Sequence, residues 1–424
     1  EVGESIYFSA GVEEADPDTL AQLFAEERNI RTPRDDFRSC LLNAALQFYY
    51  RPDATHGYLL AGYPWFGVRA RDLFIALPGC TIYADAPERF YRIMDTVLPD
   101  MRAFMRQEGI SKEIRNINEG DIGLWAIWTL QEYARWSSLP DMVSRYGDFL
   151  DELIHYYLRN VHPNLRIDDN GLCVMTGDGR PLSWMDAKVN GQAVVRREGY
   201  LVEVNALWYN ALCFYREALP QKWTPELEEL LGRVQQSFCD TFINQHGYLF
   251  DYVHPHSSWR DWSVRPNMVF ATSLPYSPLP KATRRSVLEI ITRELRTPKG
   301  LRSLSPKSDG YQPQCHGTQW QREQSYYNGS VWPWLLGPYF EACIKLYGRS
   351  AISFIENTLI GMEEELQQHG VGTVSELFDG NPPFKGRGAI SFAMSVGELL
   401  RSLALLEEAK SKYDTQILPI IRYE

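Results

Sequence analysis

Apolar residues recur at intervals of three and four along almost the whole chain, and this spacing is the strongest constraint on its fold. Between residues 350 and 369, for example, Ile352, Ile355, Leu359 and Met362 follow Ser350, a residue type favoured as a helix N-cap. Strand-like alternation is scarce, so the sequence predicts an all-α protein. The same pattern recurs in about twelve segments of ordinary helix length, at residues 37–50, 71–79, 88–108, 121–136, 142–160, 203–217, 225–243, 265–274, 282–295, 328–346, 350–369 and 390–410.

The helical segments form one domain, because no low-complexity linker or abrupt change of composition separates them. The domain is predicted to span residues 37–410. Within it, Thr224 is expected to cap a helix that has Pro225 at its first position. Pro99 lies inside the predicted helix 88–108 and is expected to kink or split it.

The two ends of the chain are less regular. Residues 1–36 form a predicted lead-in, with a strand fragment in residues 1–11 centred on residues 6–10 and a short helical run at 20–24. Residues 411–424 form a predicted C-terminal tail. Because the chain does not begin with Met, one interpretation is that it is an excised part of a longer protein whose remainder is a β-rich domain.

The loops between the predicted helices alternate in composition. Those before the even-numbered helices are rich in Gly, Pro, Trp and charged residues, and they span residues 57–71, 112–121, 171–203, 250–266, 301–329 and 371–390. If the helices pair as six hairpins in a ring, all of these loops lie at one end, where the even helices begin. Helix N-termini add backbone donors there, and loops on a rigid scaffold commonly carry function. The functional site is therefore predicted at this end.

The composition narrows the class of function. Aromatic residues make up 13% of the chain, with twelve tryptophans, and many lie in loops beside Gly, Pro, Asn and Asp. Flat rings with nearby polar groups suit the apolar face and hydroxyl rim of a sugar. A net charge of −11 argues against a nucleic-acid partner. No apolar run is long enough to span a membrane and no signal-peptide pattern is present, so a soluble protein is predicted.

The cysteines and histidines point to neither a disulfide framework nor a metal centre. Seven scattered cysteines without a CxxC pair are expected to be buried free thiols in a reducing compartment, the cytoplasm. His254 and His256 form a single His-x-His in a loop, which is weak evidence for a metal site. Phosphate-loop, dinucleotide, HExxH and GxSxG motifs are absent, so no cofactor is expected. Acidic residues in aromatic loops remain, and they are typical of glycoside hydrolases.

These loops resemble the glucosidase part of glycogen debranching enzymes in its bacterial and archaeal form, the amylo-α-1,6-glucosidase domain. The resemblance runs through about residues 37–410 and rests on seven motifs in order: Ala61-Gly62-Tyr63-Pro64-Trp65-Phe66-Gly67 with Arg71-Asp72, Ser183-Trp184-Met185-Asp186-Ala187-Lys188, Glu203-Val204-Asn205-Ala206-Leu207-Trp208-Tyr209, Arg265-Pro266-Asn267, Leu304-Ser305-Pro306, Gly329-Ser330-Val331-Trp332-Pro333-Trp334 and Ser375-Glu376-Leu377-Phe378-Asp379-Gly380.

The resemblance implies an (α/α)₆ barrel without a cofactor. It also implies hydrolysis, with inversion, of the single α-1,6-linked glucose at a branch point of glycogen or a similar α-glucan. The transferase activity that precedes this step would lie on a missing segment or on a separate protein. Two departures bear on the sugar subsites. Arg69-Ala70 stands where the family usually has Trp-Gly, and Met394 stands where it usually has Trp.

Inverting hydrolysis needs a protonated acid at the leaving oxygen and a carboxylate that activates water on the opposite face. Asp186 matches the family's general acid, and its aromatic neighbours would favour a protonated carboxyl group. A helix cap or a pair with Lys188 is the alternative. Glu376 matches the base of related inverting barrels, and Asp379 is its rival.

A second group of residues is predicted to bind the sugar. By the resemblance, Arg71 and Asp72 would clamp the terminal glucose, although a buried structural ion pair is nearly as good an explanation. Asp121, Glu203, Asn205, Arg265 and Asn267 are further candidates, each equally plausible as a helix cap, and Trp65, Trp184, Trp332 and Trp334 are candidate stacking platforms.

Two alternatives to the branch-point glucosidase remain open. One is another exo-acting α-glucosidase on the same barrel, of the glucoamylase or trehalase type, which would prefer maltose or trehalose. The other is a non-catalytic glucan-binding protein, which would bind glycogen without releasing glucose.

Overall fold

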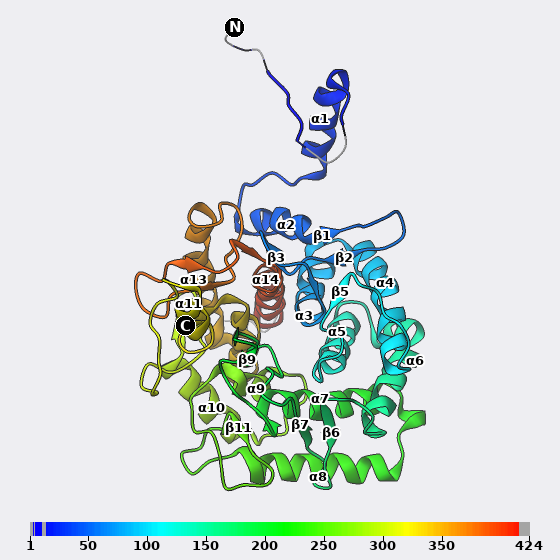
Figure 1. The fold of residues 1–424 in the computed structure, drawn as a ribbon, viewed down its shortest axis with the longest axis vertical. Helices are drawn as coiled ribbons and strands as arrows, with labels where there is room; N and C mark the ends of the chain where they lie inside the picture. Colours follow the sequence, from blue (N-terminus) through cyan, green and yellow to red (C-terminus); the bar gives the residue numbers. More distant parts are fainter. Residues whose placement is uncertain (1–2, 4, 11–13, 415–424) are drawn as a thin grey trace, which may run out of the picture.

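The computed structural model describes residue 3, residues 5–10 and residues 14–414, and it shows two concentric layers of helices (Figure 1). The inner helices contact one another in chain order, and the last contacts the first, so the ring is closed. The predicted all-α fold, an (α/α)₆ barrel, is confirmed. The inner ring consists of α3 (Ala70–Cys80), α5 (Ile122–Trp136), α7 (Val202–Ala218), α9 (Phe270–Ser273), α12 (Leu336–Tyr347) and α14 (Ala393–Asp414).

An outer helix precedes each inner helix along the chain. The outer layer consists of α2 (Phe37–Phe48), α4 (Pro87–Met105), α6 (Leu139–Leu158), α8 (Pro225–Phe242), α10 (Lys281–Glu294) and α13 (Ile352–Glu363). Burial follows the two layers. Every residue of α3 is buried, whereas α8 buries one apolar stripe, which includes Leu227, Val234 and Phe238. A helix that is apolar all round belongs in a core, and an amphipathic helix covers one.

Several helix starts agree with the sequence and others do not. Thr224 caps α8 by accepting a hydrogen bond from the Leu227 backbone amide at 3.4 Å. Ser350 does not cap α13, because it lies inside a 3-10 turn at Gly348–Ala351. Pro99 was expected to kink or split its helix, and a split is wrong, since α4 runs through this residue. Pro99 and Asp95, whose carbonyl loses its helical partner, are both exposed, so water can satisfy that carbonyl.

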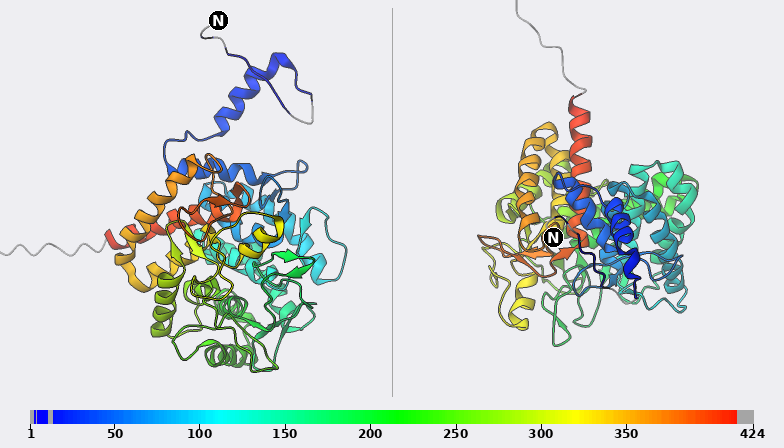
Figure 2. Two further views of the ribbon diagram at one scale, coloured as in Figure 1. Left: turned by 60° about the vertical axis from the view of Figure 1, so that its left-hand side comes forward. Right: turned by 90° about the horizontal axis from the view of Figure 1, so that it is seen from above.

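The loops and the N-terminal lead-in differ from the prediction in three more places. The predicted helix 328–346 starts later, because Val331–Trp332 is a strand and Pro333–Leu335 a 3-10 turn. An additional helix, α11 (Gln319–Tyr326), lies in the preceding loop. No strand is present in residues 5–10, and the rest of that predicted fragment is mostly outside the described residues. Helix α1 (Leu20–Ile30) buries no residue and lies away from the barrel (Figure 2).

Short strands connect the loops at the end of the barrel where the inner helices begin. β12 (Arg296–Thr297), β13 (Gly300–Arg302), β14 (Val331–Trp332), β15 (Leu377–Phe378) and β16 (Gly386–Arg387) form one antiparallel sheet. Val331 pairs with Phe378, which places the loop before α12 beside the loop before α14. The other pairs join β1 (Tyr49–Tyr50) to β2 (Tyr58–Leu59), β3 (Gly62–Tyr63) to β17 (Ser391–Phe392), β4 (Val68–Arg69) to β5 (Ile114–Arg115), β6 (Leu165–Ile167) to β7 (Cys173–Met175), β8 (Lys188–Val189) to β9 (Gln192–Ala193), and β10 (Tyr200–Leu201) to β11 (Tyr252–Val253).

The structure also shows the length of the apolar helices and the state of the cysteines. No helix in the described part of the chain is long and apolar enough to cross a membrane. All seven cysteines are free, and five of them are buried, so their thiols behave as small apolar groups of the core.

Candidate active site

Asp186 lies in the loop that leads to α7, directly after Trp184 and Met185. Its side chain is 23% exposed, and its Oδ2 atom lies 3.7 Å from Nη1 of Arg69. The Tyr327 hydroxyl donates a hydrogen bond of 2.9 Å to Oδ1. The carboxyl group therefore remains open to solvent on one side while both its oxygens have neighbours in the protein.

Glu376 lies just before β15 and is only 2% exposed. Its Oε2 atom accepts hydrogen bonds from the Ala389 amide at 2.8 Å and from the Tyr326 hydroxyl at 3.1 Å. Burial raises the pKa of Glu376 to about 7, although these hydrogen bonds and the charge of Arg69 oppose the shift. A side chain at Gly388 would place its Cβ 2.2 Å from Oε2, so only glycine leaves room for this carboxyl group.

Two consecutive tyrosines connect the candidate carboxyl groups. Tyr326 ends α11 and bonds to Glu376, and the next residue, Tyr327, bonds to Asp186. Because adjacent residues reach both groups, Asp186 and Glu376 belong to one site. This tyrosine pair was not predicted from the sequence, where its only local signal is its position directly before the Gly329–Trp334 motif.

Asp379, the alternative candidate for the general base, is hydrogen-bonded to other protein groups. Asp379 is buried and accepts hydrogen bonds from Nε and Nη2 of Arg387 at 3.0 and 2.8 Å. It also accepts one from the Cys315 amide at 2.8 Å. Arg387 belongs to β16, the partner strand of β15. Asp379 thus holds this edge of the sheet together, whereas Glu376 faces the site.

Arg71 and Asp72, the predicted sugar clamp, belong to two different ion pairs. Arg69, rather than Arg71, donates to Asp72, with a distance of 2.5 Å between Nη2 and Oδ1. Arg71 is bidentate to Asp121, with two contacts of 2.8 Å, and also bonds to Glu119. The Arg71–Asp72 pair is therefore corrected to Arg69–Asp72 and Arg71–Asp121.

Arg69 is the residue that departs from the family's usual Trp. Its guanidinium lies 4.4 Å above the Phe66 ring and beside Asp186. Its buried Nε has no hydrogen-bond partner within the described residues. Burial and the charge of Asp186 also raise the pKa of Glu323 in α11. The surroundings of Asp186 thus contain several carboxyl groups, with the guanidinium of Arg69 beside the candidate acid.

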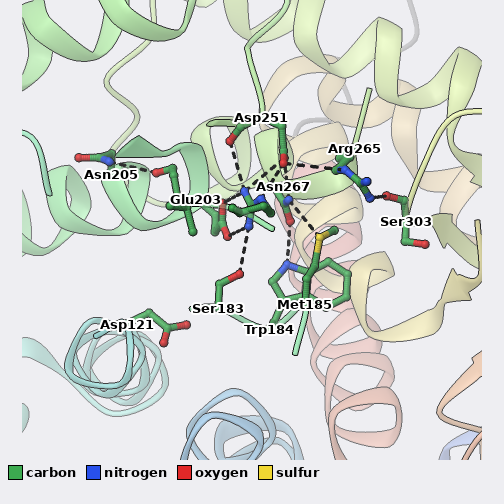
Figure 3. A network of polar contacts seen from close by, with 12 residues as sticks. Asp121, Ser183, Trp184, Met185, Glu203, Asn205, Asp251, Arg265, Asn267 and Ser303 are labelled. Carbon is green, nitrogen blue, oxygen red and sulfur yellow. Dashed lines mark hydrogen bonds and ion pairs between the residues drawn. The ribbon is translucent and has the colours of Figure 1, made fainter. Parts of the chain in front are cut away.

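A buried polar network supports the loop that carries Asp186 (Figure 3). Arg197 is its centre: its guanidinium bonds to Glu203 at 2.6 and 2.7 Å, to Asp251 at 2.6 Å and to Ser183 at 3.0 Å. All four side chains are buried. Arg197 and Asp251 were not predicted from the sequence, because they belong to none of the seven motifs.

The network continues from Asp251 to the tryptophan beside the acid. Asn267 donates to Asp251 at 2.7 Å and accepts from Trp184 Nε1 at 2.7 Å. Arg265 donates to the Ser303 carbonyl at 3.1 Å and to the Tyr327 carbonyl at 2.5 Å. Hydrogen bonds from or to Arg197, Asn267 and Arg265 therefore hold Ser183, Trp184 and Tyr327 in place.

The five further residues predicted to bind the sugar are all buried and hydrogen-bonded to protein groups. Asp121 accepts from Trp125 Nε1 at 3.1 Å as well as from Arg71, and Figure 3 shows it apart from the Arg197 network. Asn205 bonds to the backbone amide and carbonyl of Cys173 at 2.7 and 3.0 Å. Asp121, Glu203, Asn205, Arg265 and Asn267 therefore help to hold the loops in place, and their predicted contact with the sugar stays a prediction.

Of the four tryptophans predicted to stack on the sugar, three are buried and one is exposed. Trp184, Trp332 and Trp334 are buried, with ring centroids 5.3 Å and 5.2 Å from Trp184 to the other two. Tyr327 lies parallel to Trp332 at 5.1 Å, so this cluster shapes the wall behind Asp186. Trp334 also packs on Phe270 of α9 and is a core residue. Only Trp65, which is 60% exposed, offers an open ring face.

The side chains that could bind a metal do not gather into a centre. In residues 3, 5–10 and 14–414, no group of three or more His, Cys, Asp or Glu side chains is arranged to hold a metal ion. The His254 and His256 rings are 6.2 Å apart.

A helical barrel that brings two carboxyl groups into one site through adjacent tyrosines has the groups that a glycoside hydrolase needs. Residues 43–401 match the family model described as amylo-alpha-1,6-glucosidase. The chain belongs to this family. No protein with a curated description matches the sequence.

Solved structures share the fold at low sequence identity. A GH63 mannosylglycerate hydrolase from Thermus thermophilus in complex with Tris is 13% identical, with a TM-score of 0.59, covering 86% of this chain and 99% of that one. An uncharacterized conserved protein from the same organism is 14% identical, with a TM-score of 0.60 and coverages of 85% and 99%. A structure described as a wild-type glycosidase is 13% identical, with a TM-score of 0.53 and coverages of 89% and 99%.

Proposed function

We propose that the protein releases single glucose units from α-1,6 branch points of glycogen-type glucans, with inversion. The observation that carries the proposal is that Asp186 and Glu376 are hydrogen-bonded to the consecutive residues Tyr327 and Tyr326. Membership of the amylo-alpha-1,6-glucosidase family supports the choice of substrate.

In this mechanism Asp186 donates its proton to the glycosidic oxygen as the bond to the anomeric carbon breaks. Glu376 accepts a proton from a water molecule, whose oxygen attacks the anomeric carbon from the opposite face. The Arg69–Asp72 pair is suited to hold outer hydroxyls of the glucose, because charged groups make strong hydrogen bonds. Room for the water requires a separation of about 6.5–9.5 Å between the two carboxyl groups.

A second candidate is a glycosidase that acts on a sugar linked to an acidic group. One similar structure is titled a mannosylglycerate hydrolase, and Arg69 stands beside the candidate acid where the family usually has Trp. The charge of Arg69 is already paired with Asp72, however, and further carboxylates surround it. A neutral glucan therefore fits this pocket better.

The test is incubation with a 6-glucosyl cyclodextrin while proton NMR follows the product. Glucose should appear, and its first form should be the β-anomer, because inversion at an α-linkage gives β. Maltose, trehalose and mannosylglycerate are compared in parallel. Faster hydrolysis of any of these would reject the branch-point assignment, and initial α-glucose would reject the inverting mechanism.

The pH dependence follows from the raised pKa of Glu376. A general base acts in its ionised form, so kcat/KM should rise with pH through an apparent pKa of about 7. If Glu376 were the acid instead, the protonated form would act and kcat/KM would fall through the same range. A pH profile on the 6-glucosyl substrate, repeated with Tyr326→Phe, measures this limb. Loss of the Tyr326 hydrogen bond should shift the limb to higher pH, because that bond favours the ionised form.

A further inference from the structure

Two tryptophans share an open groove outside the active site. The groove has a volume of about 710 Å³, and Trp259 and Trp262 line it. Trp259 is 60% exposed and Trp262 is 44% exposed. The described residues that line it include neither Asp186 nor Glu376. Exposed indoles are costly in water, and large apolar groups gathered in one hollow commonly mark a binding site.

The structure holds both rings in place. Trp259 Nε1 donates to the Tyr252 hydroxyl at 3.1 Å, and a bridge between Val253 and Arg260 closes the turn around it. The Trp262 ring meets Phe250 at 4.6 Å and 85°, edge to face. The rings are thus fixed while a large part of each remains uncovered, which lowers the entropic cost of binding a ligand.

The rim of the groove is polar but weakly charged. Ser258 and Ser308 supply hydroxyls, Arg260 a guanidinium, and Asp261 and Asp309 carboxylates. These charges sum to one negative unit, which argues against phosphate-rich ligands or anionic lipids. Flat apolar faces surrounded by short donors and acceptors match a sugar ring, which has an apolar face and a hydroxyl edge.

The groove lies at the same end of the barrel as the active site. Its main segment runs from β11 to the 3-10 turn at Pro266–Val269, which leads into inner helix α9. β11 pairs with β10, the strand before α7 in the loop that carries Asp186. The groove and the candidate active site thus lie on neighbouring loops, an arrangement that allows one sufficiently long polysaccharide to contact both.

We propose that this groove is a second carbohydrate-binding site that takes a linear α-1,4-glucan chain. The inference rests on the proposed glucan substrate, and it adds an attachment point away from the bond that is cut. Binding there would raise the local concentration of branch points near the pocket.

The test compares Trp259→Ala/Trp262→Ala with Trp136→Ala in the full chain. Trp136 is an exposed tryptophan at the C-terminal end of α5, the opposite end of the barrel. Affinity is measured with maltoheptaose by calorimetry and with glycogen by retardation in glycogen-containing gels. Loss of two stacking rings should weaken binding about tenfold or more. Asp309→Ala, an exposed rim change, should weaken it several-fold.

Activity separates this inference from the proposed function. On a trisaccharide with one α-1,6-linked glucose, the double variant should keep the wild-type kcat/KM, which also shows that it is folded. On branched limit dextrin its kcat/KM should fall. If the double variant and the wild type were retained equally by glycogen, the groove would not be a glucan-binding site. The same conclusion would follow if Trp136→Ala lost as much retention as the double variant. Absence of glucose release by the wild type overturns the function, while selective loss of retention would still support the groove.

Discussion

Glu376→Gln and Asp186→Asn should each reduce kcat by about 10²–10⁴-fold, because each removes one proton-transfer step from the reaction. Both replacements keep the size of the side chain, and the amides can still accept from Tyr326 and Tyr327. The free energy of unfolding should therefore change much less than the rate. Glucose release from the 6-glucosyl substrate and thermal unfolding are measured on the same preparations.

Asp379→Asn is the matched control, since this carboxylate lies three residues from Glu376 but faces Arg387. It removes half of an ion pair that is partly buried, so it should lower stability while the folded protein keeps most of its kcat. An inactive Asp379→Asn together with an active Glu376→Gln would show that the base has been assigned to the wrong residue.

Arg197→Met should lower the free energy of unfolding by about 3–5 kcal/mol, because it leaves two buried carboxylates without their shared partner. Those carboxylates, Glu203 and Asp251, are both bound by the guanidinium in the native structure. The activity of the remaining folded protein should also fall, since Ser183, three residues before Asp186, loses its contact. Denaturant titration and kcat measure the two effects.

Arg196→Met provides the neighbouring control. Arg196 is exposed, so its replacement should change stability by no more than about 0.5 kcal/mol. If Arg197→Met and Arg196→Met unfolded at the same denaturant concentration, the network would not contribute the stability assigned to it. If Arg197→Met were unstable but fully active when folded, the network would stabilise the fold without positioning Asp186.

Local spacing was enough to predict the barrel helices, because helix formation depends on nearby residues. Apolar residues that repeat every three or four positions place one face toward a core, and caps such as Thr224 mark a beginning. The alternation of plain and polar loops also indicated which end of the barrel carries the site. The motifs located Asp186 and Glu376 in two of those loops.

The pairing of charges, by contrast, required the tertiary structure. Arg71 and Asp72 are adjacent in sequence, but successive residues on a helix point in different directions. Asp72 is instead reached by Arg69, three positions earlier, while Arg71 extends to Asp121 at the start of the next inner helix. Likewise, only the tertiary structure shows that Asp379 bonds to Arg387, whereas Glu376 bonds to Tyr326.

The sequence by itself thus determined the helical architecture and proposed two acidic candidates in loops at one end of the barrel, because these follow from local patterns and recognisable motifs. The tertiary structure alone decided which polar groups face the pocket and which support the loops behind it. Tyr327 acts through a partner 141 residues away, and Arg197 through one 54 residues away. Burial and hydrogen bonding depend on such long-range packing, which no local pattern encodes.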